Sequence, residues 1–275
     1  MTEAVSKLHP DLAAALIGLC VGFMSGIFGI GGGVLLVPAF LLILKLQQKL
    51  AHGSALVAGV LLAFSGATLY VIGGNTNFVA AASVFIGSFS GVLLGTWLLK
   101  KIEIRILMYV FMAVLVATAV RLFIGSGYSS GPAYESLTVW LVLGFIATGL
   151  VAGTFSGLLG IGGGIIMVPT FILLFGFSAV VAKGTSLCVI VPTGTTGTLR
   201  NRKYGNINLR AGLFAGLGGV PMALFGAWVA SRMSEVLSEI LFGVLIVVVA
   251  ANMFRKTLQL RREAQELPVS MPLTD

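Results

Sequence analysis

The chain has 275 residues, of which 57% are hydrophobic and only 9% are charged, and its mean hydropathy is +1.06. A soluble domain carries about 25% charged residues, so this composition excludes an ordinary soluble protein. The net charge of +8 could suit a nucleic-acid partner. The basic residues, however, lie in short clusters between apolar runs, as topology determinants of membrane proteins do. We therefore expect an all-α polytopic membrane protein, embedded in a lipid bilayer, with no nucleic-acid partner.

Apolar segments recur along the whole chain at lengths typical of membrane helices. They cover residues 12–28, 33–44, 51–72, 79–99 and 105–124 in the first half, and 138–159, 164–176, 184–199, 211–230 and 237–254 in the second. The second segment of each half is short, because about 12 helical residues span only ~18 Å of a ~30 Å hydrocarbon core. The first two segments of each half are therefore either full crossings or the two arms of a re-entrant hairpin.

An internal repeat organises the sequence. The phrase GIFGIGGGVLLVP begins at Gly26 and returns as GLLGIGGGIIMVP at Gly157, which is 131 positions later. The same shift aligns HGSAL, which begins at His52, with KGTSL, which begins at Lys183. A match that keeps its register over so long a stretch predicts two homologous halves. We assign four parts, namely a first membrane repeat (10–124), a linker (125–137), a second membrane repeat (138–256) and a cytoplasmic tail (257–275).

The positions of the basic residues predict how these repeats are oriented. Three clear spans follow each glycine cluster, and the cluster with its flanks adds an even number of crossings, so each repeat crosses an odd number of times. The second repeat must then be inverted relative to the first. With the N-terminus in the cytoplasm, all but three of the 17 Lys and Arg residues face the cytoplasm, as the positive-inside rule requires. We predict inverted-topology repeats with cytoplasmic N- and C-termini.

The two GIGGG clusters are the first candidate site. Each glycine costs a helix roughly 1 kcal/mol, so the clusters predict interrupted or re-entrant helices. Backbone N–H groups freed inside a membrane must face protein, water or a ligand, and a helix start directs such groups at an anion. Interrupted helices in inverted repeats are typical of secondary transporters. We expect substrate contacts from Gly29, Gly31, Gly32, Gly33, Gly160, Gly162, Gly163 and Gly164.

Hydroxyl side chains form a second candidate set, most of them at equivalent positions of the two halves. A hydroxyl in a membrane helix either bonds back to its own helix or serves as a neutral donor to an oxyanion. His52 and Lys183 are also equivalent, and they either mark the membrane interface or act as cationic gates on opposite sides. The candidate substrate-binding hydroxyls are Ser25, Ser54, Ser65, Ser156, Thr185, Ser186 and Thr196.

Carboxylates are absent from most of the predicted membrane interior. No Asp or Glu lies between Asp11 and Glu103, or between Glu135 and Glu235. Pathways for cations and protons through membranes carry buried carboxylates. An interior with donors but without carboxylates therefore favours an anionic substrate and disfavours a carboxylate proton relay.

The remaining reactive side chains do not form a catalytic or metal site. Neither Ser25 nor Ser156 has a basic partner that would make it a nucleophile. Cys20 and Cys188 show neither a disulfide framework nor the spacing of metal ligands. We predict that the protein is not an enzyme and has no cofactor, no catalytic residue and no metal site.

The duplicated SGIFGIGGGVLLVP and SGLLGIGGGIIMVP, together with HGSAL and KGTSL, resemble the sulfite exporter TauE/SafE family of bacterial membrane permeases. The resemblance covers nearly the whole chain, about residues 12–256. It implies transport of small sulfur-containing anions, such as sulfite, sulfoacetate and other organosulfonates, across a bacterial cytoplasmic membrane. This substrate class agrees with the anion that the residues favour by themselves.

We therefore expect a secondary transporter of small sulfur-containing anions that works by alternating access, with export as the favoured direction. An anion channel of the same architecture and an importer of sulfur oxyanions are the alternatives. A membrane scaffold fits less well, because the chain offers almost no loops to a partner. Homo-oligomerisation is left open by the sequence.

Overall fold

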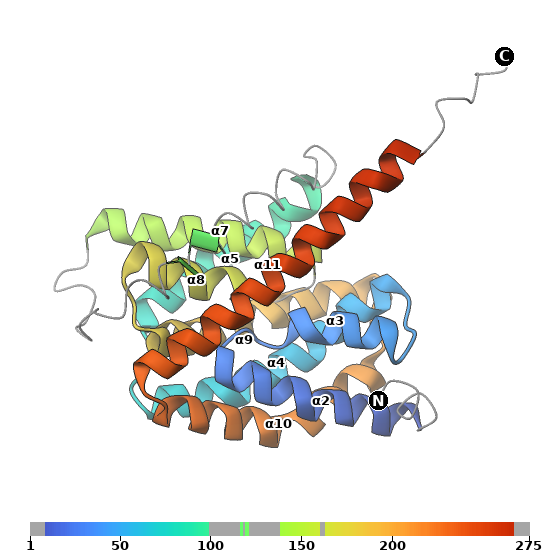
Figure 1. Ribbon diagram of the computed structural model, residues 1–275, viewed down its shortest axis with the longest axis horizontal. Coiled ribbons are helices and arrows are strands. Elements are labelled where there is room, and N and C mark those ends of the chain that lie inside the picture. Colours follow the sequence, from blue (N-terminus) through green and yellow to red (C-terminus); the bar gives the residue numbers. More distant parts are fainter. Residues whose placement is uncertain (1–8, 99–115, 118, 121–137, 160–162, 267–275) are drawn as a thin grey trace, which may run out of the picture.

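The computed structural model describes residues 9–98, 116–117, 119–120, 138–159 and 163–266, which form helices and no strand. This confirms the predicted all-α fold (Figure 1). The helices are α2 (Pro10–Phe28), α3 (Gly33–Leu42), α4 (Gln48–Ile72), α5 (Phe78–Leu98), α7 (Val139–Leu159), α8 (Gly164–Phe175), α9 (Ala179–Lys203), α10 (Leu209–Arg232) and α11 (Glu235–Glu266).

Each of these helices overlaps one predicted apolar segment, and most of the segment 105–124 lies outside the described residues. The largest early start is that of α9, which begins at Ala179 rather than at 184. The Ser178 hydroxyl accepts a hydrogen bond from the Val181 N–H at 3.4 Å and so caps this earlier start. At the other end of the chain, α11 continues through Glu266, into the segment predicted as a tail.

The two halves pack through pairs made of one helix from each half. Helix α2 of the first half packs along α10 of the second, and α5 of the first half packs along α7 of the second. Glycines let the backbones touch. A Cβ atom on Gly22 would overlap the carbonyl oxygen of Gly219, and a Cβ atom on Gly153 would overlap that of Ser88. Small residues at helix spacing serve such close contacts in membranes. The 131-residue shift aligns α2 with α7 and α5 with α10. The contact between α2 and α10 is therefore equivalent to the contact between α7 and α5.

The central helices α4 and α9 pack against each other and run in opposite directions. Near the start of α4, Gly53 touches the carbonyl oxygen of Asn206, which follows the end of α9. Near the start of α9, Gly184 touches the carbonyl oxygen of Asn75, which follows the end of α4. The two equivalent helices α4 and α9 are therefore antiparallel.

Helix α3 folds back on α2. Gly32, at the start of α3, lies against Val21 of α2, and Phe40 near its end packs in one apolar cluster with Ala51 and Ala55 at the start of α4. The ten residues of α3 extend only ~15 Å, so α3 is too short to cross a ~30 Å hydrocarbon core by itself.

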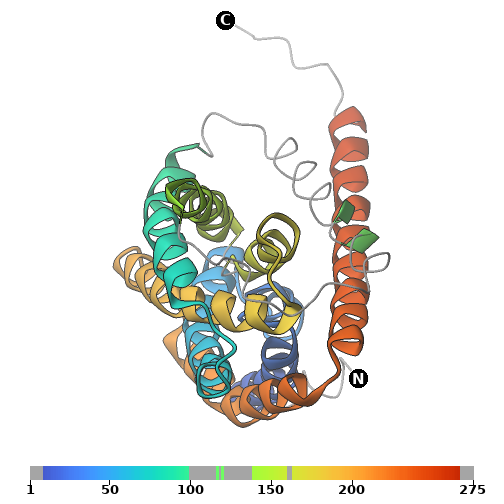
Figure 2. The ribbon, with the colours of Figure 1, turned by 90° about the vertical axis from the view of Figure 1, so that its left-hand side faces the viewer.

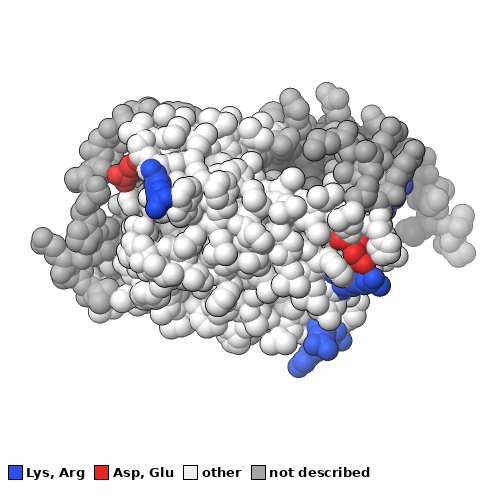
Figure 3. All heavy atoms as spheres, turned by 90° about the horizontal axis from the view of Figure 1, so that it is seen from below, with Lys and Arg blue, Asp and Glu red and all other residues white. Residues whose placement is uncertain are grey.

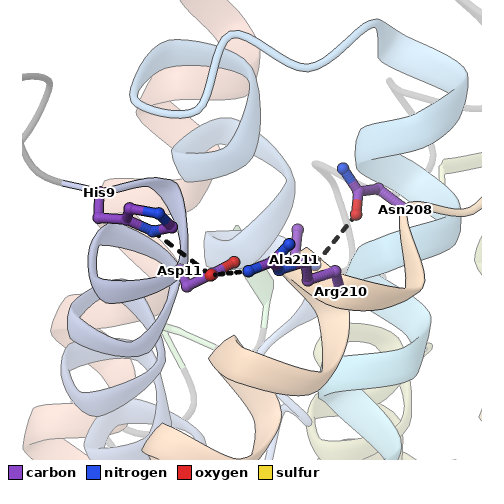
Figure 4. A network of polar contacts seen from close by, with 5 residues as sticks. All are labelled: His9, Asp11, Asn208, Arg210 and Ala211. Atoms are coloured by element: carbon purple, nitrogen blue, oxygen red, sulfur yellow. Dashed lines mark hydrogen bonds and ion pairs between the residues drawn. The ribbon is translucent and has the colours of Figure 1, made fainter.

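Polar contacts at one end of the molecule join the parallel starts of α2 and α10 (Figure 4). Arg210 Nη2 donates to Asp11 Oδ2 at 2.6 Å, and His9 Nδ1 lies 3.4 Å from the same oxygen. Asn208 Oδ1 accepts from the Ala211 N–H at 3.1 Å and caps α10. The pair Asp11–Arg210 therefore joins the two helices where their starts lie together.

The surface is that of a membrane protein. Large apolar side chains are exposed, among them Phe64 at 63% and Leu217 at 61%, and soluble monomers rarely expose so much contiguous apolar surface. In Figure 3 the charged residues lie toward the two ends of the molecule, with an uncharged surface between them. Helices α2, α4 and α10 and the segment Val139–Ser156 are long and apolar enough to cross a membrane. Figure 2 shows α11 along one side of the bundle.

Candidate functional site

The bend between α2 and α3 consists of glycines in the left-handed conformation. Gly29, Gly31 and Gly32 have φ values of 68°, 69° and 76°, which residues with a Cβ atom rarely adopt. In the second half, Gly163 is the equivalent of Gly32, and it precedes α8 with a φ of 73°. The helix is interrupted at both clusters, as their glycine content predicts.

The bend presents backbone donors at the start of α3. The N–H groups of Leu35 and Leu36 donate to the Gly32 carbonyl oxygen at 3.0 and 2.9 Å and close the first helical turn. Among the described residues, no hydrogen bond is donated by the N–H groups of Gly31, Gly32 or Gly33. Such groups, with the positive end of the helix dipole, favour an anion.

The two glycine clusters meet at α9. A Cβ atom on Gly164 would lie 2.9 Å from the Ile30 Cα atom and 2.8 Å from Ile190 Cδ1. A Cβ atom on Gly31 would lie 2.8 Å from the same Ile190 atom. The start of α8 therefore abuts the bend of the first half, whereas Gly160 and Gly162 lie outside the described residues.

One face of α9 follows this bend for two turns. Gly29 packs on Lys183, since a Cβ atom there would lie 2.6 Å from the Lys183 Cα atom, and Gly31 packs on Ile190. Ser186 lies between these two contacts, three residues after Lys183 and four before Ile190, which places it on the same helical face. The sequence-predicted residues Ser186 and Lys183 are thus brought to the first glycine cluster.

Two hydroxyls near this bend lack partners. The Oγ atoms of Ser25 and Ser186 are buried, and neither has a hydrogen-bond partner within the described part of the chain. Ser25 lies one helical turn before Gly29, whose N–H donates to the Ser25 carbonyl oxygen at 2.9 Å. An unsatisfied buried hydroxyl costs about 1–3 kcal/mol. These two hydroxyls are therefore candidate contacts for a polar ligand at the bend. The equivalent Ser156 is also buried, but residues 160–162 lie outside the described residues.

Four other predicted site hydroxyls are bonded to the backbone. Ser65 donates to the Leu62 carbonyl oxygen at 2.9 Å, and Thr196 donates to that of Thr193 at 2.7 Å, so both bond back to their own helices. The two remaining hydroxyls brace loops of the opposite half. Ser54 Oγ accepts from the Asn208 N–H at 2.9 Å and Thr185 Oγ1 from the Asn77 N–H at 3.0 Å.

Removal of these bracing hydroxyls is expected to lower stability. Ser54→Ala and Thr185→Val each leave a partly buried backbone N–H without its acceptor, which costs about 1–2 kcal/mol. Thermal unfolding in detergent should show a lower melting temperature for each variant. Thr68→Val is the matched control, because its exposed hydroxyl bonds only to the Phe64 carbonyl oxygen of its own helix. Equal melting temperatures for all three variants would contradict the bracing role.

The side chain of Lys183 is fully buried within the protein. Its Nζ donates to Ser238 Oγ of α11 at 2.6 Å and lies 5.6 Å from the centre of the Phe242 ring. Glu239 interacts electrostatically with the same ammonium. Sequence reasoning missed these α11 partners, since they have no motif and lie 55 or more residues away. The equivalent His52 is half-buried at the start of α4.

A separate cavity of about 240 Å³ opens between α5 and α9. Its basic side chains come from the last turns of α9 and give its mouth a positive charge, which would attract anions. The lining residues are Phe89, Val92, Thr196, Leu199, Arg200 and Lys203.

Comparison with known proteins identifies the class of the molecule. The sequence profile of the family described as "Sulfite exporter TauE/SafE" matches residues 2–122 and 145–274. The chain belongs to the sulfite exporter TauE/SafE family. No solved structure matches this TauE/SafE chain.

Curated relatives are similar over most of their length. "Probable membrane transporter protein YunE" of Bacillus subtilis (strain 168) is 28% identical over 234 residues, which cover 77% of this chain and 84% of the relative. A "Probable membrane transporter protein" of Xylella fastidiosa (strain Temecula1 / ATCC 700964) is 23% identical over 236 residues, with coverages of 85% and 90%. The TauE/SafE protein is thus a multi-pass membrane transporter of a small molecule, and not an enzyme.

Proposed function

We propose that this TauE/SafE protein carries small sulfur-containing anions, such as sulfite or sulfonates, across the bacterial cytoplasmic membrane by alternating access. The main support is the pair of buried hydroxyls of Ser25 and Ser186 beside the glycine bend, neither of which has a partner in the part of the chain that the structure describes. An oxyanion has acceptor oxygens for both hydroxyls and for the unbonded N–H groups of Gly31–Gly33. The proposed contacts are Ser25, Gly29, Gly31, Gly32, Gly33, Gly163, Gly164 and Ser186.

Burial of the site favours alternating access over an open channel. The side chains of Ser25, Lys183 and Ser186 are 0% exposed, so an anion held by them is closed off from both sides in this state. Export is the favoured direction because the membrane potential drives an anion outward, by ~2.3 kcal/mol per charge per 100 mV. No coupling ion is needed for this movement.

The antiparallel arrangement of α4 and α9 supports inverted repeats in the membrane, with both termini in the cytoplasm. In this arrangement the loops that contain Asn75 and Asn206 lie at opposite ends of these helices. We expect Asn75→Cys and Asn206→Cys, each in a cysteine-free background, to react with a membrane-impermeant maleimide from opposite sides of the membrane. Labelling of both from one side would refute the inverted topology.

A ligand screen tests the proposed substrate class. The purified protein should melt at a higher temperature with its substrate, because a ligand that binds only the folded state stabilises it by mass action. We expect sulfite, sulfoacetate or thiosulfate to raise the melting temperature in a saturable way, and acetate at the same ionic strength to leave it unchanged. The absence of a shift with every sulfur anion would contradict the proposed function.

A further inference from the structure

Lys183 carries its charge on a side chain that is fully buried. Taking such a group out of water costs several kcal/mol unless counter-charges and hydrogen bonds replace the water. In this structure its partners come from the first turns of α11, namely the Ser238 hydroxyl at 2.6 Å, the Phe242 ring at 5.6 Å and the carboxylate of Glu239. Lys183 therefore has an internal counter-ion on one side.

The other side of the same residue faces the glycine bend. Gly29 packs directly on the Lys183 backbone and Cβ atom, and the unpartnered hydroxyl of Ser186 lies one turn further along α9. The ammonium and the unsatisfied donors thus belong to neighbouring positions around one bend. An anion seated at the bend would therefore lie beside the residue that carries this charge.

The equivalent positions of the first half do not carry the same side chains. With the 131-residue shift, the equivalent of Lys183 is His52 and the equivalent of Ser186 is Ala55. The equivalent of Glu239 is Met108, which carries no charge. At equivalent positions, the sequence therefore pairs a lysine, a serine and a glutamate with a histidine, an alanine and a methionine, which makes the two sets of positions chemically unequal.

We propose that Lys183 is the fixed charge of a single anion site at the first glycine bend, and that a bound anion replaces Glu239 as its counter-ion. This inference rests on the proposed function and deepens it. In the empty state Ser238 accepts a hydrogen bond from the ammonium, and Glu239 interacts with it electrostatically. In the bound state the oxyanion accepts from Lys183, and the carboxylate of Glu239 then opposes binding, because two negative charges near one ammonium repel each other.

Sulfite binding to the purified full chain tests the inference, with the saturable rise in melting temperature as the readout. Lys183→Met should raise the Kd at least about a hundredfold, because a charge-assisted partner is lost in a buried site. Glu239→Gln keeps the shape but removes the competing charge, so the Kd should fall about tenfold. Glu235→Gln, one turn earlier on α11, is the matched control and should stay within about twofold of the wild type.

The variants separate the inference from the proposed function. Lys183→Met alone removes one partner of a buried charge pair, which is destabilising, so the double variant Lys183→Met, Glu239→Gln, which removes both charges, is measured as well and should bind sulfite as weakly. Wild-type binding of sulfite by Lys183→Met, or weaker binding by Glu239→Gln, would overturn the inference while the proposed function stands. If the wild type itself binds none of the sulfur anions, the proposed function fails.

Discussion

Replacement of Gly22 by leucine is expected to abolish the folded protein or to leave it with a greatly lowered melting temperature. A Cβ atom at this position would overlap the carbonyl oxygen of Gly219 on α10. Overpacking of a core that can adjust its side chains costs about 1–3 kcal/mol. Here the obstacle is backbone, so the cost should exceed ~3 kcal/mol, and the α2–α10 contact should be lost. Size-exclusion profiles and thermal unfolding in detergent would measure this.

Two further variants make the result specific. Cys20→Leu adds similar bulk two residues earlier on α2, at an exposed position, and should melt like the wild type. Gly153→Leu meets the carbonyl oxygen of Ser88 across α7 and α5, and it should be as harmful as Gly22→Leu. A Gly22→Leu protein that melts at the wild-type temperature would show that the backbones of α2 and α10 do not touch.

Loss of both hydroxyls at the glycine bend is expected to impair transport without impairing stability. The double variant Ser25→Ala, Ser186→Ala removes two donors to the anion, each worth about 1.5–3 kcal/mol for a charged acceptor. The KM for sulfite flux in proteoliposomes should rise at least about tenfold. The melting temperature of the empty protein should stay the same or rise, because two unsatisfied buried oxygens disappear.

Ser65→Ala and Thr196→Val serve as controls for this experiment. Their hydroxyls bond to carbonyl oxygens of their own helices, so the KM should remain close to that of the wild type. A lower melting temperature together with lower flux in the Ser25, Ser186 double variant would indicate a structural role for these hydroxyls. Unchanged flux would remove them from the proposed site.

Local features of the sequence determined the helices and their interruptions. Apolar composition fixes which segments avoid water, and consecutive glycines break a helix wherever they occur, because both effects act within a few residues. The bend at Gly29–Gly33 and the start of α8 at Gly164 could therefore be predicted. The helices α4 and α9 begin at equivalent positions of the repeat, Gln48 and Ala179, although the predicted segments began later, at 51 and 184.

Only the tertiary structure decided which polar side chains serve the candidate site. Ser54 and Ser25 are both serines within apolar segments. The Ser54 hydroxyl accepts a hydrogen bond from the Asn208 N–H in the other half, whereas the Ser25 hydroxyl has no partner among the described residues. The sequence alone allows Lys183 to be read as a residue at the membrane interface. In the structure its ammonium donates a hydrogen bond to Ser238 of α11, which lies 55 residues later in the sequence. Helix propensity depends on near neighbours, whereas the partner of a buried polar group depends on which distant helices pack against it.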